Sequence, residues 1–277
     1  MSVNVALLGT GKMGAAIARR VAGAGFPLRL WNRTPDRARA VGVGEVAATA
    51  REAAAGADVV LSILFDPASV EAVYAGLEPR AGQVFVEMST AGPEVLERLA
   101  PGLQAHGAEL LAAPVVGSIP AVEQASALIL VGGDAAAFER ARPVLAAFGQ
   151  PEPAGSRREA AALKLLNNAM LGVCSLAAAE LMAAATRTGL DRDAAFRILC
   201  RSMPYLQARR RGYLEGSHDR PLFELAGMVK DLTLALDTGR RAGAAMPVTA
   251  LSRELYAQAE PQHGREEMTA VIERYPT

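Results

Sequence analysis

The chain has 277 residues, which is enough for one large or two medium domains. Its 29 lysine and arginine residues balance 29 aspartate and glutamate residues, so the charge favours neither nucleic acid nor an anionic membrane as a partner. Cys174, Cys200 and three scattered histidines lack metal-ligand spacing, which predicts reduced thiols, no metal site and a cytoplasmic protein.

The first 31 residues follow a strand, loop, helix, strand pattern. An apolar run at 3–8 predicts a buried parallel strand, and no basic segment precedes it, so we expect no signal peptide. A glycine-rich loop follows, then a helix predicted at 13–24 and a second apolar strand at 28–31. This order is typical of a dinucleotide-binding βαβ unit.

The glycines of this loop have separate physical roles. Gly9 permits a tight turn, Gly11 lets the backbone approach a pyrophosphate, and Gly14 lets the helix pack closely on the strand. The helix N-terminus would present free N–H groups to the phosphates. A structural turn without a ligand is the alternative. The expected cofactor-binding residues here are Gly9, Thr10, Gly11, Lys12, Met13 and Gly14.

The residues after the second strand favour NADP over NAD. NAD-binding proteins place an acidic residue there, whereas this chain has Asn32, Arg33 and Thr34. No carboxylate among these three repels a 2′-phosphate, and Arg33 can pair with one. The alternative is that Arg33 is solvated and Thr34 caps the next helix, ahead of Pro35.

Strand and helix patterns continue to alternate up to about residue 148, which predicts a doubly wound α/β sheet of the Rossmann type. Ligands of such sheets gather at the carboxyl ends of the strands, so the loops at 64–66, 89–90 and 114–118 are candidate sites. The predicted strands are 58–64, 84–88, 109–113 and 127–131, and the predicted helices are 49–55, 67–74, 93–106 and 134–148.

The proline- and glycine-containing stretch 150–158 is the best candidate for a domain boundary. We therefore expect a Rossmann domain at 1–157 and an all-α C-terminal domain at 158–277, with Asp191 and Thr249 as helix caps. No convincing strand pattern follows the boundary. The predicted helices are 160–188, 191–200, 204–211, 228–242, 247–260 and 266–274.

The helix predicted at 160–188 is the longest in the chain. Its uncharged run is short and interrupted by Asn167 and Asn168, so we interpret it as a core helix and not as a membrane span. Lys164 shares one face with these two amides. Taken alone, Lys164 could extend to the surface.

Four motifs in this order resemble the β-hydroxyacid dehydrogenase family, which includes 3-hydroxyisobutyrate dehydrogenases and glyoxylate or succinic semialdehyde reductases. The resemblance covers nearly the whole chain. The glycine motif is Leu8-Gly-Thr-Gly-Lys-Met-Gly14, the substrate loop is Ala113-Pro-Val-Val-Gly-Ser118, the catalytic helix motif is 155–168, and the C-terminal lysine motif is Lys230-Asp-Leu-Thr-Leu-Ala235.

The resemblance implies roles for individual residues. Lys164 would be the catalytic acid or base, because hydride addition to a carbonyl builds negative charge on oxygen, and burial would lower the pKa of its ammonium group. Asn168 would hold Lys164 or the substrate oxygen. Lys230 would approach the cofactor or substrate. The alternative is that Lys230 lies at the surface and forms an ion pair there. Leu64, Phe65 and Thr90 would line the cofactor, and Val116, Gly117 and Ser118 the substrate.

The substrate loop departs from the family pattern, since Val116 and Ser118 replace a common serine and glycine, and Ala112 a common aspartate. The loop sequence mildly favours the semialdehyde or glyoxylate reductase branch, with NADPH as cofactor. There are two alternatives. One is an imine reductase on the same fold, and the presence of Lys164 argues against it. The other is a non-catalytic NADP-binding regulatory module. By resemblance, we also expect a homodimer or homotetramer.

Overall fold

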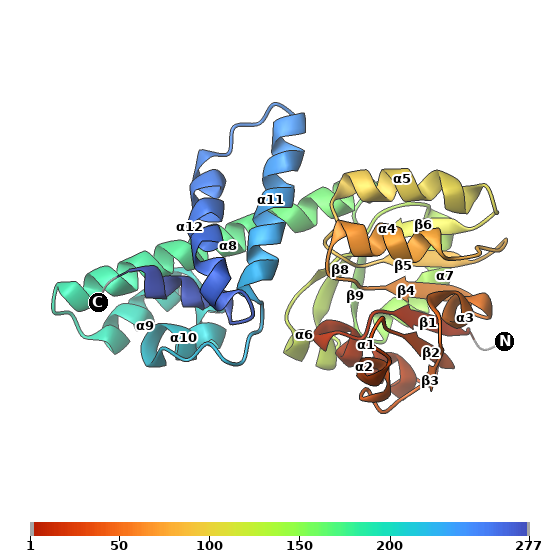
Figure 1. Ribbon diagram of the computed structural model, residues 1–277, viewed down its shortest axis with the longest axis horizontal. Helices are drawn as coiled ribbons and strands as arrows, with labels where there is room; N and C mark the ends of the chain where they lie inside the picture. Colours follow the sequence, from red (N-terminus) through yellow and green to blue (C-terminus); the bar gives the residue numbers. More distant parts are fainter. Residues whose placement is uncertain (1–2, 276–277) are drawn as a thin grey trace. The chain divides into compact units, whose positions relative to one another are not determined.

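The computed structural model describes residues 3–275 and forms two compact units, Met1–Lys164 and Leu165–Thr277 (Figure 1). The division falls inside helix α8 (Arg157–Arg187), which is the long helix predicted from the sequence. The boundary predicted at residue 157 coincides with the first residue of this helix. One continuous helix therefore carries Lys164 in the first unit and Asn168 in the second.

The first unit is built on a six-stranded sheet with the order β3-β2-β1-β4-β5-β6, in which every pairing is parallel. The chain order reverses between β1 and β4, which creates the switch point where doubly wound sheets bind ligands. The predicted fold class is confirmed. The strands are β1 (Val5–Leu8), β2 (Leu28–Trp31), β3 (Glu45–Val46), β4 (Val59–Ser62), β5 (Val84–Glu87) and β6 (Glu109–Ala112).

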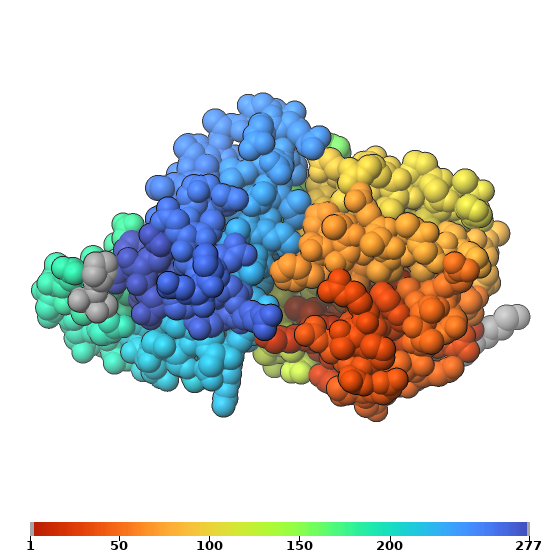
Figure 2. Space-filling model, viewed as in Figure 1, coloured from red at the N-terminus to blue at the C-terminus, as the bar shows by residue number. Residues whose placement is uncertain are grey.

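Helices cover both faces of this sheet and form two cores. Because side chains alternate along a strand, Leu7 enters one core with α1 (Lys12–Gly23) and α7 (Ala135–Ala146), whereas Leu8 enters the other. The second core contains α3 (Ala50–Ala55), α4 (Pro67–Ala75) and α5 (Pro93–Gln104). The orange-to-yellow segments that include these three helices form most of the visible surface of this unit (Figure 2). Short α2 (Pro35–Arg39) follows β2.

A second, three-stranded sheet of order β7-β8-β9 completes the first unit, and its last strand corrects a prediction. The stretch expected to be a break contains β9 (Gly149–Pro153), which pairs in parallel with β8 (Ala127–Val131). Pro151 and Pro153 are tolerated because β9 is an edge strand. Strand β7 (Val115–Val116) and helix α6 (Ile119–Glu123) were not predicted because they are too short to show a periodic pattern.

Within the described residues, the second unit is helical, and a single isolated bridge joins Glu224 and Glu267. Asp191 caps α9 as predicted, since its carboxylate accepts from Ala194 N at 2.7 Å. Thr249 is not a cap, because α12 begins at Pro247 and buries Thr249. The elements are α9 (Arg192–Ser202), 3₁₀ helix η1 (Pro204–Arg209), α10 (Arg210–Glu215), α11 (Leu225–Arg241), α12 (Pro247–His263) and 3₁₀ helix η2 (Met268–Arg274).

Helix α8 is the core helix of this unit. Among the described residues it is the one helix that is long and apolar enough to cross a membrane, so its length and composition do not by themselves exclude a span, contrary to the argument from its uncharged run. Half of that apolar window is buried inside the protein, however. Tyr256 and Tyr213 donate their buried hydroxyls to the carbonyls of Gly172 and Ser175. Cys174 and Cys200 are half-buried free thiols.

Candidate active site

The glycine loop joins β1 to α1, and its glycines differ in what surrounds them. A Cβ at Gly9, where φ is +102°, would lie 2.2 Å from Ile63 O, and a Cβ at Gly14 would lie 2.1 Å from Gly9 O. Both glycines are therefore required by the packing of the protein itself. A Cβ at Gly11 would meet nothing within 4 Å. The chain thus leaves open space at the N-terminus of α1.

Two further features make this space fit a dinucleotide pyrophosphate. Gly11 is the N-cap of α1 and provides no side chain, so the first N–H groups of the helix are available to an anion. The Thr10 hydroxyl is buried and has no hydrogen-bond partner among residues 3–275. Lys12 begins the helix and is exposed, and the half-buried Met13 packs against the core.

The end of β2 holds the residues predicted to choose the cofactor. Asn32 Oδ1 accepts from Thr10 N at 3.1 Å, and Asn32 Nδ2 donates to Thr34 O at 3.0 Å. The Asn32 side chain therefore ties the glycine loop to the end of β2. Arg33 and Thr34 are exposed, and Thr34 begins α2 without a side-chain capping bond. Asp36, the next acidic residue, pairs with Arg39 at 2.6 Å.

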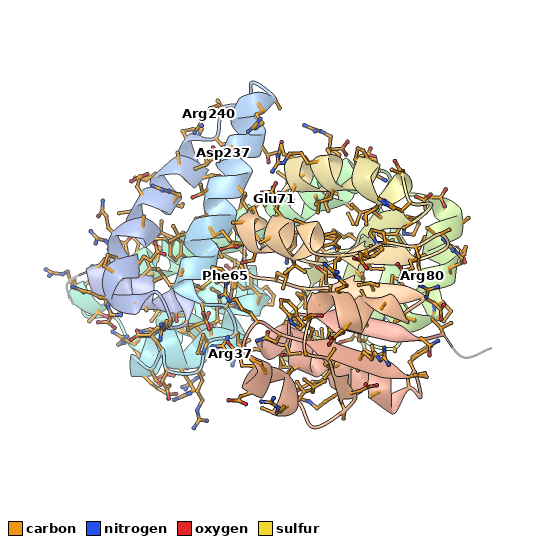
Figure 3. All side chains as sticks on the ribbon, turned by 45° about the vertical axis from the view of Figure 1, so that its right-hand side comes forward. Arg37, Phe65, Glu71, Arg80, Asp237 and Arg240 are labelled. Atoms are coloured by element: carbon orange, nitrogen blue, oxygen red, sulfur yellow. The ribbon has the colours of Figure 1, made fainter. Side chains whose placement is uncertain are left out.

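The loops after β4 and β5 lie at the same edge of the sheet. Figure 3 shows Phe65 and Arg37 at this edge and Arg80, which precedes β5, at the opposite one. Phe65 is 56% exposed, so an apolar ring faces solvent where ligands of this fold bind. Leu64 and Thr90 are half-buried. The structure thus brings the three predicted cofactor loops to the carboxyl ends of β1, β4 and β5.

Lys164 is half-buried and contacts the predicted substrate loop. Its ammonium group donates to the carbonyl oxygen of Val115, in β7, at 2.8 Å. Val116 follows in the same strand, and a Cβ at Gly117 would lie 3.0 Å from Ala127 Cβ, so this loop packs tightly on β8. Ser118 is the N-cap of α6 and makes no side-chain capping bond. Lys164 is therefore anchored at the loop and does not extend into solvent.

In the helical unit, Asp231 links Asn168 to Lys230. The Asp231 carboxylate is buried and accepts from the Asn168 amide at 2.5 Å and from Lys230 Nζ at 2.6 Å. Asn167 donates to the other end of the Asn168 amide at 3.0 Å. Asn168 therefore has a fixed orientation, with its amide group donating to Asp231. The ion pair considered as the alternative for Lys230 exists, but its carboxylate is buried.

Sequence reasoning missed Glu87, which ends β5 and is buried. It accepts hydrogen bonds from Ser62 Oγ and Ser89 N. Burial raises the pKa of the Glu87 carboxyl, and these hydrogen bonds partly oppose the shift. The sequence did contain a signal for Glu87, because a carboxylate at the end of an otherwise apolar buried strand is costly unless it has a specific role or partner.

The family models agree with the two-part organisation. The NAD binding domain of 6-phosphogluconate dehydrogenase matches residues 4–165, and the NAD-binding domain of NADP-dependent 3-hydroxyisobutyrate dehydrogenase matches residues 159–275. Together with the parallel sheet and the glycine loop, these matches define an NAD(P)-dependent oxidoreductase. The chain belongs to the β-hydroxyacid dehydrogenase family.

Several relatives are similar over their full length. L-threonate dehydrogenase of Cupriavidus necator is 30% identical over 100% of this chain and 97% of the relative. 3-Hydroxyisobutyrate dehydrogenase of Pseudomonas aeruginosa is 30% identical over 98% of both chains. Among solved structures, Mycobacterium tuberculosis 3-hydroxyisobutyrate dehydrogenase with L-serine has a TM-score of 0.86 at 28% identity and covers 100% of both chains. An imine reductase from Pseudomonas, 21% identical with a TM-score of 0.64, shares the fold.

Proposed function

We propose that this protein is an NADPH-dependent reductase of small aldehyde or keto acids, with Lys164 as the general acid. The observation that carries the proposal is the hydrogen bond from Lys164 Nζ to Val115 O, which holds an ammonium group at the substrate loop. Helix α8 fixes the lysine backbone and strand β7 fixes the acceptor. The site can therefore present a proton donor in one position without rearrangement.

Lysine usage gives independent support. The chain has three lysines among its 29 basic residues, and they are Lys12, Lys164 and Lys230, one in each of three motifs. Every other cation is arginine, which stays protonated in proteins, whereas lysine can lose and regain a proton. A chain that otherwise uses arginine has lysine at the position where proton transfer is proposed, Lys164, and at two positions proposed to contact the cofactor, Lys12 and Lys230.

The proposed chemistry assigns one step to each group. Bound NADPH supplies a hydride to the carbonyl carbon of the substrate. Lys164 donates a proton to the carbonyl oxygen, so the product is the hydroxy acid and the lysine is left neutral until solvent reprotonates it. Asn168, one helical turn from Lys164 and oriented by Asp231, is proposed to hydrogen-bond the substrate oxygen or Lys164. Lys230 is proposed to contact the cofactor.

Substrate choice rests on the loop at 116–118. Val116 offers no hydroxyl, so Ser118 Oγ and the backbone of Gly117 are the proposed contacts of the substrate carboxylate. Glyoxylate and succinic semialdehyde are the proposed substrates for reduction. The names of the relatives add 3-hydroxyisobutyrate and L-threonate as candidates for the reverse oxidation.

An imine reductase is the second candidate function, because reductive aminases and an imine reductase share this fold with TM-scores near 0.65. Lys164 at the substrate loop argues against it, since imine reductases of this fold generally lack that lysine. A non-catalytic NADP-binding module is a further alternative. Such a module would bind NADPH and turn over none of these substrates.

The test follows NADPH oxidation with glyoxylate, succinic semialdehyde, methylglyoxal and a cyclic imine, and NADP⁺ reduction with the two hydroxy acids. We expect Lys164→Ala to lower kcat by about 10²-fold or more, because it removes the proton donor. Lys164→Arg should fail almost as severely, since it keeps the charge but cannot release a proton at neutral pH. Circular dichroism and thermal unfolding should show that both variants fold.

Arg158→Ala is the matched control, since it removes an exposed cation near the start of α8. Its turnover should equal that of the wild type. A Lys164→Ala variant as active as the wild type would remove this lysine from the mechanism. Turnover of the cyclic imine alone would favour the second candidate function.

A further inference from the structure

Glu87 is an ionisable group buried inside the parallel sheet. It is 1% exposed, ends β5, and lies in register beside Ser62 of β4 and Ala112 of β6. A carboxylate in such a place is costly unless hydrogen bonds compensate for the lost water. None of the roles described above for the cofactor or substrate uses this side chain. Its position therefore needs an explanation of its own.

The hydrogen bonds of Glu87 connect two loops. One carboxylate oxygen accepts from Ser62 Oγ, and the other accepts from Ser89 N at 2.8 Å. The Ser89 hydroxyl in turn accepts from Leu64 N at 2.7 Å. The loop after β5, which holds Ser89 and Thr90, is thereby tied to the loop after β4, which holds Leu64 and Phe65.

The connection extends to the glycine loop. Ile63, next to Leu64, packs so closely on this loop that a Cβ at Gly9 would lie 2.2 Å from Ile63 O and 3.0 Å from a methyl carbon of Leu64. Tyr74 of α4 places its buried hydroxyl near the same carboxylate, and burial followed by the charge of Glu87 raises its pKa well above 10.0. Glu87 is thus linked through Ser62 and Ser89 to the segments after β4 and β5, and the segment after β4 packs on the glycine loop.

We propose that Glu87 is a positioning residue that sets the nicotinamide half of the cofactor site through Ser89. In a doubly wound sheet, the β1–β2 side takes the adenine nucleotide, and the side that contains β4 and β5 takes the other nucleotide. Glu87 lies on the second side. This inference rests on the proposed cofactor site, and its test separates the two.

The two carboxyl oxygens explain how the side chain works. One accepts from Ser62 Oγ and the other from Ser89 N, so Glu87 holds these two groups together. Methionine has a similar length but no oxygen acceptor, so both groups lose their partner. Ser89 is then no longer held at this position, and Leu64 N loses a fixed acceptor. Hydrogen bonds to charged groups are strong enough that we expect NADPH affinity to fall about tenfold or more.

The experiment measures direct binding and not turnover. NADPH binding is followed by nicotinamide fluorescence, and binding of adenosine 2′,5′-bisphosphate, which represents the adenine half, is followed by calorimetry. The variants are Glu87→Met and Ser89→Ala. The matched control is Gln83→Met, which removes a buried amide at the amino end of the same strand, where it donates to Ala54 O and Ala57 O at 2.9 Å.

We expect Glu87→Met and Ser89→Ala to weaken NADPH binding about tenfold or more and to leave the bisphosphate affinity unchanged. Gln83→Met should lower Tm and change neither affinity. Wild-type affinity for NADPH in the folded Glu87→Met and Ser89→Ala proteins overturns the inference, and so does an equal loss of affinity for NADPH and the bisphosphate. If Glu87→Met does not fold, the result with Ser89→Ala decides. A wild-type protein that fails to bind NADPH rejects the proposed function instead.

Discussion

At the scale of single residues, side chains that hold other side chains matter as much as those proposed to touch the ligands. Asn32 orients the glycine loop through Thr10 N, and Asp231 orients Asn168 and Lys230. Arg33 differs from these residues, because it is exposed and its proposed partner lies outside the protein. A residue of this kind is best assigned by a change in ligand preference.

We predict that Arg33→Ala raises KM for NADPH by about tenfold and leaves KM for NADH nearly unchanged, because only NADPH carries the 2′-phosphate that the guanidinium would pair with. Initial rates with both cofactors check this. Arg19→Ala, which removes an exposed cation from the middle of α1, should change neither constant. Equal losses with NADPH and NADH in Arg33→Ala would reject the 2′-phosphate role.

At the scale of elements, the glycine loop separates the needs of folding from those of binding. Gly9 and Gly14 leave no room for a methyl group, whereas Gly11 opens on free space. The sequence motif predicted separate roles for the three glycines, with Gly11 as the one that a pyrophosphate approaches. The structure shows that, of these three positions, only Gly11 opens on free space, because a Cβ at either of the other two would meet neighbouring backbone.

We predict that Gly11→Ala folds with a free energy of unfolding within about 1 kcal/mol of the wild type but binds NADPH at least tenfold more weakly, since its methyl group occupies space reserved for the pyrophosphate. Gly14→Ala should instead lower Tm strongly, because its Cβ would lie 2.1 Å from Gly9 O. Thermal unfolding and fluorescence titration distinguish the two variants. Normal NADPH affinity in Gly11→Ala would contradict this assignment.

At the scale of the whole molecule, helix α8 supplies residues to both compact units and also carries an exposed apolar strip. Leu166 and Met170, one turn apart, are 60% and 65% exposed, and Leu163 lies one turn earlier. Large apolar side chains grouped on one helix face are typical of a protein interface. We propose that this strip contributes to the contact between copies of the chain in a homodimer or homotetramer.

We predict that the wild type elutes as a dimer or tetramer and that Met170→Glu shifts it toward monomer, because a charge buried in an apolar contact is unfavourable. Size-exclusion chromatography with light scattering measures this. Gln104→Glu adds the same charge to an exposed position on α5 and should leave the assembly unchanged. A monomeric wild type, or an unchanged mass for Met170→Glu, would contradict the proposal.

The sequence by itself determined the class of the protein. The glycine motif between a strand and a helix, the alternation of elements up to residue 148 and the long alanine-rich helix are local patterns, and local physics sets them. The alternation of elements pointed to the loops at the strand ends, and the resemblance to the family pointed to Lys164. Strand β9 was not predicted, because two prolines indicate a break in the chain unless the strand is known to lie at the edge of a sheet.

Only the tertiary structure decided which polar groups meet. Four hydrogen bonds join residues 25 to 63 positions apart: Lys164 to Val115, Asn168 to Asp231, Ser62 to Glu87 and Leu64 to Ser89. No local pattern encodes such pairs, because strand order and helix packing bring them together. Burial then makes them consequential, since a buried polar group without its partner costs far more than an exposed one.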